Sequence, residues 1–259
     1  MFSSNLNLLK QLVKRDVLAK YKGSSLGILW SVVIPIMLLA IYTFVFSVVF
    51  EARWNVQSNN HLQFALIIFS GMTIFNFFSE VINRSPTLII GNSNYVKKVI
   101  FPLHLLPVSI VLSSIVHMLI SFIILFIGLA FFGGGIHITA LYLPLVCLPI
   151  ILFATGLSWF LASLGTYVRD VSYVVNVLTS ALMFLSPIFY PVSSVPKELR
   201  FLYNLNPISF TVEDMRNVLI WGVRPDFVWL GYGTLIGIVF CLLGYYWFKK
   251  TKGGFADVL

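Results

Sequence analysis

The stretch from Arg15 to Pro35 reads RDVLAKYKGSSLGILWSVVIP, and in it a cluster of charged residues is joined directly to a long apolar run. The cluster contains Arg15, Lys20 and Lys22, and from Leu26 onward almost every side chain is hydrophobic. A basic segment followed at once by an apolar one is typical of a surface helix that leads into a membrane-crossing helix. The residues between Gly23 and Gly27 provide the bend between the two helices.

Composition extends this interpretation to the whole chain. Of the 259 residues, 59% are hydrophobic and only 10% are charged, and the mean hydropathy is +0.94. A helix needs about 20 apolar residues to cross a bilayer. Six windows satisfy this length, at 29–50, 62–82, 105–132, 138–165, 173–192 and 227–248. The sequence therefore predicts an all-α polytopic membrane protein with six transmembrane helices.

These windows lie in a single transmembrane domain over residues 1–259. We divide it into a cytoplasmic interface helix (1–28), a six-span bundle (29–248) and a cytoplasmic tail (249–259). The third and fourth windows exceed what one crossing needs, so we expect them to tilt, or to kink at Pro144 or Pro149.

The distribution of Lys and Arg sets the orientation, because cytoplasmic segments retain positive charge. With the N-terminus inside, 12 of the 17 cations are cytoplasmic: Lys10, Lys14, Arg15, Lys20, Lys22, Arg84, Lys97, Lys98, Arg169, Lys249, Lys250 and Lys252. Both termini are then cytoplasmic. The net charge of +8 is a topology signal with some contact to anionic lipids, and it does not indicate nucleic-acid binding.

Residues 5–22 form an amphipathic pattern, with Lys10, Gln11, Lys14, Arg15 and Lys22 on one helical arc. Such a helix lies flat on the cytoplasmic leaflet. Asp16 and Lys20 have i,i+4 spacing and are expected to neutralise one another. Two interpretations remain open. The helix is an electrostatic anchor, or Lys14, Arg15, Lys20 and Lys22 also receive a phosphate-bearing ligand.

Four stretches together resemble the membrane subunit of polysaccharide-exporting ATP-binding-cassette transporters. The first continues from Arg15 as RDVLAKYKGSSLGILWSVVIPIMLLAIYTFVF. The others are FNFFSEVINRSPTLIIGNSNYVKKVIFPLHLLP from Phe75, YVRDVSYVV from Tyr167, and SPIFYPVSSVPKELRFLYNLNPISFTVEDMRNVL from Ser186. The pattern covers about residues 15–220 and departs from the family at Asn76, where an aromatic residue is commoner.

The resemblance implies a homodimer joined to two copies of a separate ATPase in the bacterial cytoplasmic (inner) membrane. The cargo would be a polysaccharide linked to polyprenyl pyrophosphate, most often O-antigen, received at the basic helix. ATP and Mg²⁺ would bind the partner ATPase, with no cofactor on this chain. Consistent with this, the sequence contains no phosphate-binding loop: GYYWFKKT from Gly244 has Lys249 where the second glycine is required.

The resemblance also suggests where the ATPase is contacted. The expected residues are Tyr95, Val96, Lys97, Lys98, Val99, Ile100 and Phe101, with Arg169 and Asp170 in the next cytoplasmic turn. Two alternatives stay open. The first segment is a simple interfacial loop, and Arg169 with Asp170 is a local salt bridge.

Aromatic residues in the matching stretches are candidates for a glycan conduit, because aromatic faces bind sugar rings without strong directional preference. They are Tyr42, Phe46, Phe75, Phe77, Phe78, Phe184, Phe189 and Tyr190. For any one of them, packing or lipid contact is an alternative. Between spans five and six we expect short re-entrant or interfacial helices that act as an outer gate, or that have no moving role. Their gate residues are Pro196, Leu199, Leu202, Tyr203, Val212, Met215 and Leu219.

Few polar groups fall inside the predicted spans. Glu80 is expected to pair with Arg84 at i,i+4 spacing, His117 is expected to be a hydrogen-bonded packing residue, and no metal site is predicted. A competing hypothesis is a membrane-embedded transferase that acts on a lipid-linked sugar, with Glu80, Asp170, His104 or His117 as its acid or base. Another is the same fold exporting a drug or a lipid.

Overall fold

The computed structural model of the protein describes residues 2–45, 61–97 and 101–259, without the side chains of residues 2–4, 61, 202, 204 and 205. Within these ranges every regular element is a helix, which confirms the all-α prediction. Four predicted site residues, Phe46, Lys98, Val99 and Ile100, lie outside the described residues, as does the side chain of Leu202.

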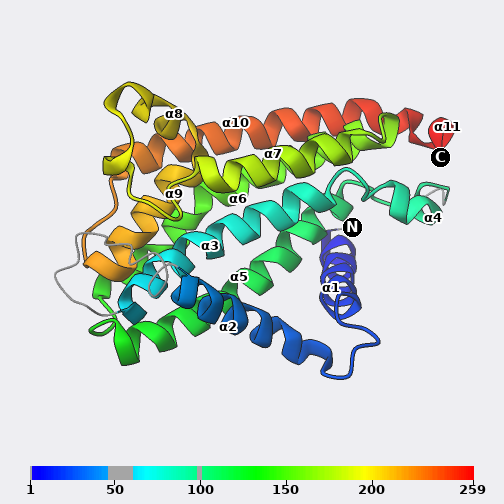
Figure 1. The fold of residues 1–259 in the computed structure, drawn as a ribbon. Coiled ribbons are helices and arrows are strands. Elements are labelled where there is room, and N and C mark those ends of the chain that lie inside the picture. Colours follow the sequence, from blue (N-terminus) through cyan, green and yellow to red (C-terminus); the bar gives the residue numbers. More distant parts are fainter. Residues whose placement is uncertain (1, 46–60, 98–100) are drawn as a thin grey trace.

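The long helices run side by side across Figure 1. They are α2 (Trp30–Tyr42), α3 (His61–Arg84), α5 (Leu105–Phe132), α6 (Leu143–Tyr167), α7 (Val171–Leu185) and α10 (Phe227–Thr251). The short helices are α4 (Ser93–Val96), α8 (Arg200–Leu205), α9 (Pro207–Arg216) and α11 (Phe255–Val258). In the figure α4 and α11 lie at one end of the bundle, and α8 lies at the other.

Five helical segments in the described chain are long and apolar enough to cross a membrane: Gly27–Val45, Leu62–Arg84, Leu105–Phe132, Ile138–Tyr167 and Phe227–Val258. They match five of the six predicted windows. The window 173–192 contains α7, which is apolar but only 15 residues long. At about 1.5 Å per residue, α7 is shorter than the hydrocarbon core, so the sixth crossing stays a prediction.

Helix ends follow local chemistry. The window at 138–165 begins with a 3₁₀ turn (Ile138–Tyr142), and α6 starts at Leu143 with Pro144 in its first turn, where a missing N–H is tolerated. Asp226 caps α10 by accepting hydrogen bonds from the backbone N–H groups of Val228 and Trp229. Gly222 ends the π-helical segment Asn217–Trp221 in the left-handed conformation, with φ of 65°.

The N-terminal helix α1 (Phe2–Ala19) crosses the direction of the long helices at the end that carries both chain termini (Figure 1). Its Leu12 and Val17 are buried and α1 packs on α5, while Lys10, Lys14 and Arg15 are exposed. This is the arrangement that an amphipathic surface helix needs, with one face on the bundle and a cationic face outward.

The pair α6 and α10 forms the closest packing in the bundle. A side-chain carbon on Gly156 would lie 2.3 Å from the carbonyl oxygen of Phe240, and one on Gly244 would lie 2.0 Å from the carbonyl oxygen of Gly156. Only glycine allows backbones to approach this closely. The two glycines therefore fix the distance between α6 and α10.

We expect Gly244→Ala to lower the free energy of unfolding by about 2 kcal/mol, because the added methyl overlaps backbone atoms that cannot move independently. Gly231→Ala is the matched control on the same helix, since nothing lies within 4 Å of its added carbon. In the control, the higher helix propensity of Ala should leave stability unchanged or slightly raised. Thermal unfolding in detergent measures both variants, and equal midpoints would contradict the packing argument.

Candidate functional site

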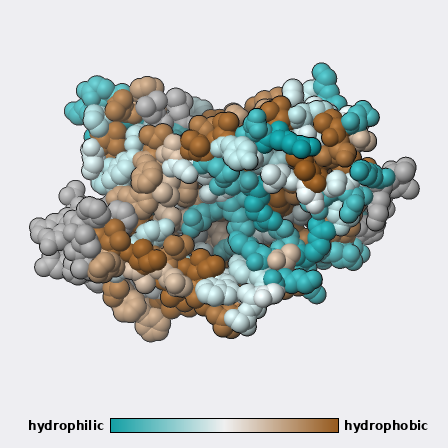
Figure 2. All heavy atoms as spheres, turned by 45° about the vertical axis from the view of Figure 1, so that its right-hand side comes forward, coloured by the Kyte–Doolittle hydropathy of each residue, from teal (hydrophilic) through white to brown (hydrophobic). Residues whose placement is uncertain are grey.

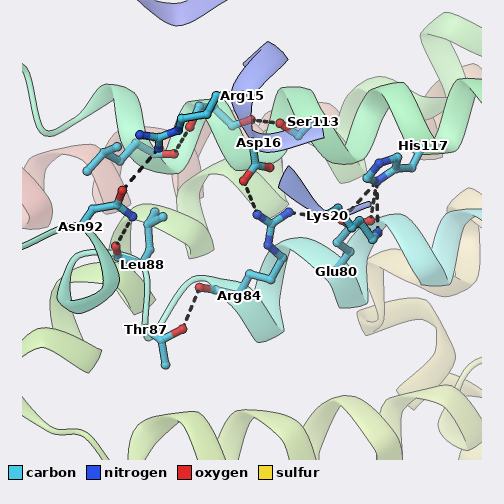
Figure 3. Close-up of polar contacts among 12 residues, drawn as sticks. Arg15, Asp16, Lys20, Glu80, Arg84, Thr87, Leu88, Asn92, Ser113 and His117 are labelled. Carbon is cyan, nitrogen blue, oxygen red and sulfur yellow. Dashed lines mark hydrogen bonds and ion pairs between the residues drawn. The ribbon is translucent and has the colours of Figure 1, made fainter. Parts of the chain in front are cut away.

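Five charged or titratable side chains meet where α1 crosses α3 and α5 (Figure 3). Glu80 of α3 lies at the centre. Its carboxylate is 2.9 Å from Nζ of Lys20, 3.3 Å from Nη1 of Arg84 and 3.0 Å from Nδ1 of His117. The second carboxylate, Asp16, forms an ion pair with Nη2 of Arg84. We call Asp16, Lys20, Glu80, Arg84 and His117 the charge cluster.

The chemistry of the charge cluster is balanced. Two carboxylates face two cations, so the cluster is neutral when His117 is neutral. An ionised carboxylate can only accept, so Glu80 assigns the proton of the neutral imidazole to Nδ1. Glu80 and His117 are largely shielded, with 16% and 13% of their side chains exposed, whereas 41% of Lys20 is exposed. Three partners therefore compensate for the partial burial of one carboxylate.

The charge cluster confirms one predicted pair and corrects another. Glu80 and Arg84 pair at i,i+4 spacing as predicted. Asp16 and Lys20 do not neutralise one another: both reach from α1 to α3, where Asp16 meets Arg84 and Lys20 meets Glu80. His117 is hydrogen-bonded as predicted, although its carboxylate partner Glu80 was not anticipated. The reason is that sequence spacing cannot report contacts between helices.

A second contact ties α1 to the segment predicted to meet the ATPase. Arg15 donates a hydrogen bond to the hydroxyl of Tyr95 at 2.6 Å, and its guanidinium carbon lies 5.5 Å from the centre of that ring. Tyr95 stacks on Phe101 with ring centres 4.2 Å apart. Arg15 also reaches Asn92 at 3.4 Å. The basic helix and the expected motor contact are therefore adjacent.

The four cations proposed to receive a phosphate fall into two groups. Arg15 and Lys20 are bound to Tyr95 and Glu80, whereas Lys14 and Lys22 are exposed and their side chains contact no polar group in the described part of the chain. In Figure 2, which turns this end of the molecule toward the reader, hydrophilic residues form a band across the middle with hydrophobic surface on both sides. An anion from the bilayer surface would meet Lys14 and Lys22 first.

The remaining residues of the expected motor contact lie at the same end of the bundle. Lys97 is exposed, and Val96 is half-buried against the core. Arg169 and Asp170 are exposed in the turn before α7, and the ion pairs found among described residues do not include one between them. The structure therefore does not support the alternative of a local salt bridge between Arg169 and Asp170, and both residues are exposed.

The predicted conduit residues separate into two sets. Phe75, Phe77 and Phe78 are buried within the protomer, where Phe78 stacks on Phe153. They line no surface of the protomer, because other helices surround most of α3. Tyr42, Phe184, Phe189 and Tyr190 are brought together instead.

These four residues form an aromatic cluster across α2, the end of α7 and the following loop. Phe189 lies 6.3 Å from Tyr42 and 6.2 Å from Phe184, measured between ring centres. Tyr190 shares a hydrogen bond of 2.6 Å with the hydroxyl of Tyr203 in α8. Phe184 is exposed and the other three are half-buried, so this cluster presents aromatic surface at the end of the bundle opposite α1.

The residues expected to form the outer gate differ in their burial. Pro196 and Leu199 are exposed and Tyr203 is half-buried, whereas Val212, Met215 and Leu219 are fully buried. The last three anchor α9 and the π-helical segment against α3 and α6. The burial of this face favours an anchoring role for α9. Of the expected gate, residues 196–203 are then the part that is less tightly packed against the bundle.

Arg216 was not singled out by the sequence, although the structure gives it a central position. Its side chain is only 2% exposed, and it donates to the carbonyl oxygens of Pro187 at 2.6 Å, Ile188 at 2.8 Å and Ile67 at 3.3 Å. Burial lowers the pKa of Arg216 to about 9 and nearby Glu213 raises it, so the guanidinium stays protonated at neutral pH. Arg216 therefore ties α9 to α3 and to the chain that leaves α7.

The chain resembles known proteins over most of its length. The sequence pattern described as "ABC-2 type transporter" matches residues 7–220. The chain is 26% identical to an O-antigen export system permease protein, RfbA, of Klebsiella pneumoniae, over 98% of this chain and 95% of that protein. It is 29% identical to RfbA of Myxococcus xanthus (85% and 82% covered) and 24% identical to the polysialic acid transport protein KpsM of Escherichia coli (89% and 88% covered).

A double-mutant cycle tests the link from α1 to α3. Glu80→Gln should lower the free energy of unfolding by about 2 kcal/mol, because it leaves three groups without their carboxylate. Lys20→Gln should lower the free energy of unfolding by less, since Lys20 is partly exposed. In the double variant, the loss of free energy of unfolding should differ from the sum of the two single losses by about 0.5 kcal/mol or more. Glu198→Gln, at an exposed carboxylate, is the control. Strict additivity in thermal unfolding would exclude the contact.

Replacing Arg216 should destabilise the outer end of the bundle. Arg216→Met leaves the carbonyl groups of Pro187 and Ile188 without this donor, whereas the carbonyl of Ile67 keeps its hydrogen bond from Ser70, and it should lower the free energy of unfolding by about 3 kcal/mol. Arg216→Lys should recover only part of this lost stability, because a single ammonium cannot reach carbonyl groups on separate segments as the branched guanidinium does. The exposed Arg224→Met is the control, and unfolding midpoints that are equal for Arg216→Met and Arg224→Met would contradict this role.

Proposed function

Because the chain belongs to the ABC-2 type transporter family, we propose that it is the membrane subunit of an ATP-driven exporter that moves a polyprenyl-pyrophosphate-linked polysaccharide out of the cytoplasm. The most favoured cargo is O-antigen. The observation that carries the proposal is the similarity over nearly the whole chain to permeases named for O-antigen export. The protein is then a multi-pass component of the bacterial inner membrane, with both termini in the cytoplasm.

The first step is capture of the pyrophosphate at α1. Lys14 and Lys22 make the first contact, because they are exposed and have no partner among the described side chains. Arg15 and Lys20 extend the positive surface, although Tyr95 and Glu80 already hold part of their hydrogen-bonding capacity. The charge cluster keeps α1 at a fixed height relative to α3 and α5, so that the captured headgroup enters beside the spans.

The second step is coupling to ATP. Two copies of a separate ATPase bind ATP and Mg²⁺ and contact the segment 95–101 together with Arg169 and Asp170, and this chain itself carries no cofactor. The Arg15–Tyr95 contact supports this arrangement, since it joins the expected motor contact to the helix that captures the headgroup. Closure of the ATPase would therefore move both elements together.

The third step is passage of the glycan between two copies of the chain. The helices α2 and α7 support this, because little of either is buried within one protomer: Ser31 is the buried residue of α2, and Val175 and Thr179 are those of α7. Tyr42, Phe184, Phe189 and Tyr190 offer sugar-binding faces along that side. Phe75, Phe77 and Phe78 are buried within the protomer and take no part in this path. The outer gate consists of residues 196–203, which α9 anchors to the bundle.

The alternative functions have less support. A transferase would need Glu80 or His117 as a free acid or base, whereas the oxygens of Glu80 are occupied by Lys20, Arg84 and His117. A drug or lipid exporter would share the fold, but the relatives reported above are named for O-antigen export and polysialic acid transport.

Deletion of the gene in its own host tests the proposal, with fractionation of the polyprenyl-linked glycan. Export predicts that full-length, lipid-linked polymer accumulates on the cytoplasmic side, because synthesis continues without transport. A missing or chemically altered polymer without accumulation would contradict export and favour the transferase.

The double variant Lys14→Gln, Lys22→Gln should reduce export about 30-fold, because each of the two cations near a membrane-bound phosphate contributes about 1 kcal/mol. Pulse labelling of surface polymer measures the rate, with the protein level in the membrane as a reference. Lys197→Gln with Arg224→Gln removes the same charge on the predicted outer side and should leave export unchanged. Equal export by the two double variants would contradict the proposal that Lys14 and Lys22 capture the pyrophosphate.

A further inference from the structure

A groove of about 350 Å³ lies between α6 and α10, outside the site described above. Its floor is formed by Gly156 and Gly244, the pair whose missing side chains allow the two backbones to touch. Leu157, Phe160, Leu243 and Trp247 contribute to its walls. The groove is therefore a consequence of the glycine packing: two helices come close, and large side chains on both sides enclose the depression.

Cations lie one turn beyond the groove. Lys250 follows Trp247 by three residues and Leu243 by seven, so it lies on the same face of α10. Lys249 and Lys250 are both exposed, and no carboxylate in the described part of the chain pairs with either. Trp247 and Tyr246 lie between the apolar groove and these cations, as aromatic residues do at the level of lipid headgroups.

We infer that this groove binds one anionic phospholipid. The acyl chain lies over Gly156 and Gly244 between Phe160 and Leu243, and the phosphate lies at Lys250, while Lys249 on the other side of α10 adds positive charge at the same height. Apolar walls exclude a polar ligand from the groove, and unpaired lysines at its end favour a negative headgroup over a neutral one. The inference is independent of the proposed cargo, since it concerns a resident lipid on the outside of the bundle.

A second copy of the chain fits this face less well. A two-fold contact centred on the groove would place Lys249 and Lys250 of one protomer near the same residues of the other. Like charges at that distance oppose association, whereas a phospholipid neutralises them. The charge pattern thus favours the lipid as the occupant.

Native mass spectrometry of the full-length protein tests the inference, with phosphatidylglycerol and phosphatidylcholine of identical acyl chains as probes. The wild type should retain one phosphatidylglycerol per chain, with about a tenfold preference over phosphatidylcholine. Lys249→Gln with Lys250→Gln should abolish that preference. Lys197→Gln with Arg224→Gln removes equal charge elsewhere and should keep it.

A second pair of variants tests the groove without changing charge. Leu243→Trp fills it and should abolish retention of both lipids, whereas Leu242→Trp, at an exposed neighbour outside the groove, should retain them. Equal retention by the two tryptophan variants would overturn the inference, as would equal binding of the two lipids by the wild type. Loss of a dimer in Leu243→Trp alone would also overturn it, because it would assign the face to a subunit contact.

Discussion

The carboxylate of Glu80 organises the cytoplasmic end of this protein. It lies in a membrane helix, where an unpaired charge is costly. Its partners are Lys20 from the turn after α1, Arg84 from its own helix and His117 from α5. Arg84 then joins Asp16 of α1 to the same group. Removing Lys20 or Arg84 would leave a carboxylate uncompensated, so the position of α1 across the bundle follows from electrostatic balance as well as from the burial of Leu12 and Val17.

The two ends of the bundle are held by different means. At the end that carries α1, side chains of opposite charge pair between helices. At the other end, Arg216 donates to the carbonyl groups of Pro187 and Ile188, which follow the end of α7 and have left the α-helical hydrogen-bond pattern, and also to the carbonyl of Ile67 within α3. Both devices place a cation where backbone or carboxylate oxygens would otherwise lack a partner. Between the two ends, the long helices α6 and α10 pack through glycines, and Ser163 and Tyr167 of α6 add hydrogen bonds to Thr251 at the end of α10.

Much of the fold could be predicted from the sequence, because long apolar windows and an amphipathic period depend only on local order. Five of the six windows, the helical character of α1 and the Glu80–Arg84 pair were found in this way. The exchange of partners by Asp16 and Lys20 could not be found, since periodicity defines which residues share a face and not which helix meets that face.

Two further features of the candidate site depend on contacts between helices in the same way. Phe75, Phe77 and Phe78 looked like conduit residues by type, whereas the central position of α3 buries them. Arg216 looked like an ordinary charge in an amphipathic helix, and only the folded chain shows that it is surrounded by carbonyl groups. A signal was available in the sequence, because Arg216 follows the apolar Val212 by four positions and a helix therefore places both on one face.

The central claim is that α1 captures a pyrophosphate-linked glycan for ATP-driven export. The most direct measurement is transport by the chain and its ATPase reconstituted in vesicles, with a short fluorescent glycan on polyprenyl pyrophosphate. The account predicts ATP-dependent movement of this substrate, and much slower movement of the same glycan on a neutral polyprenyl carrier. Equal rates for the charged and neutral carriers, or no ATP-dependent movement of either, would contradict it.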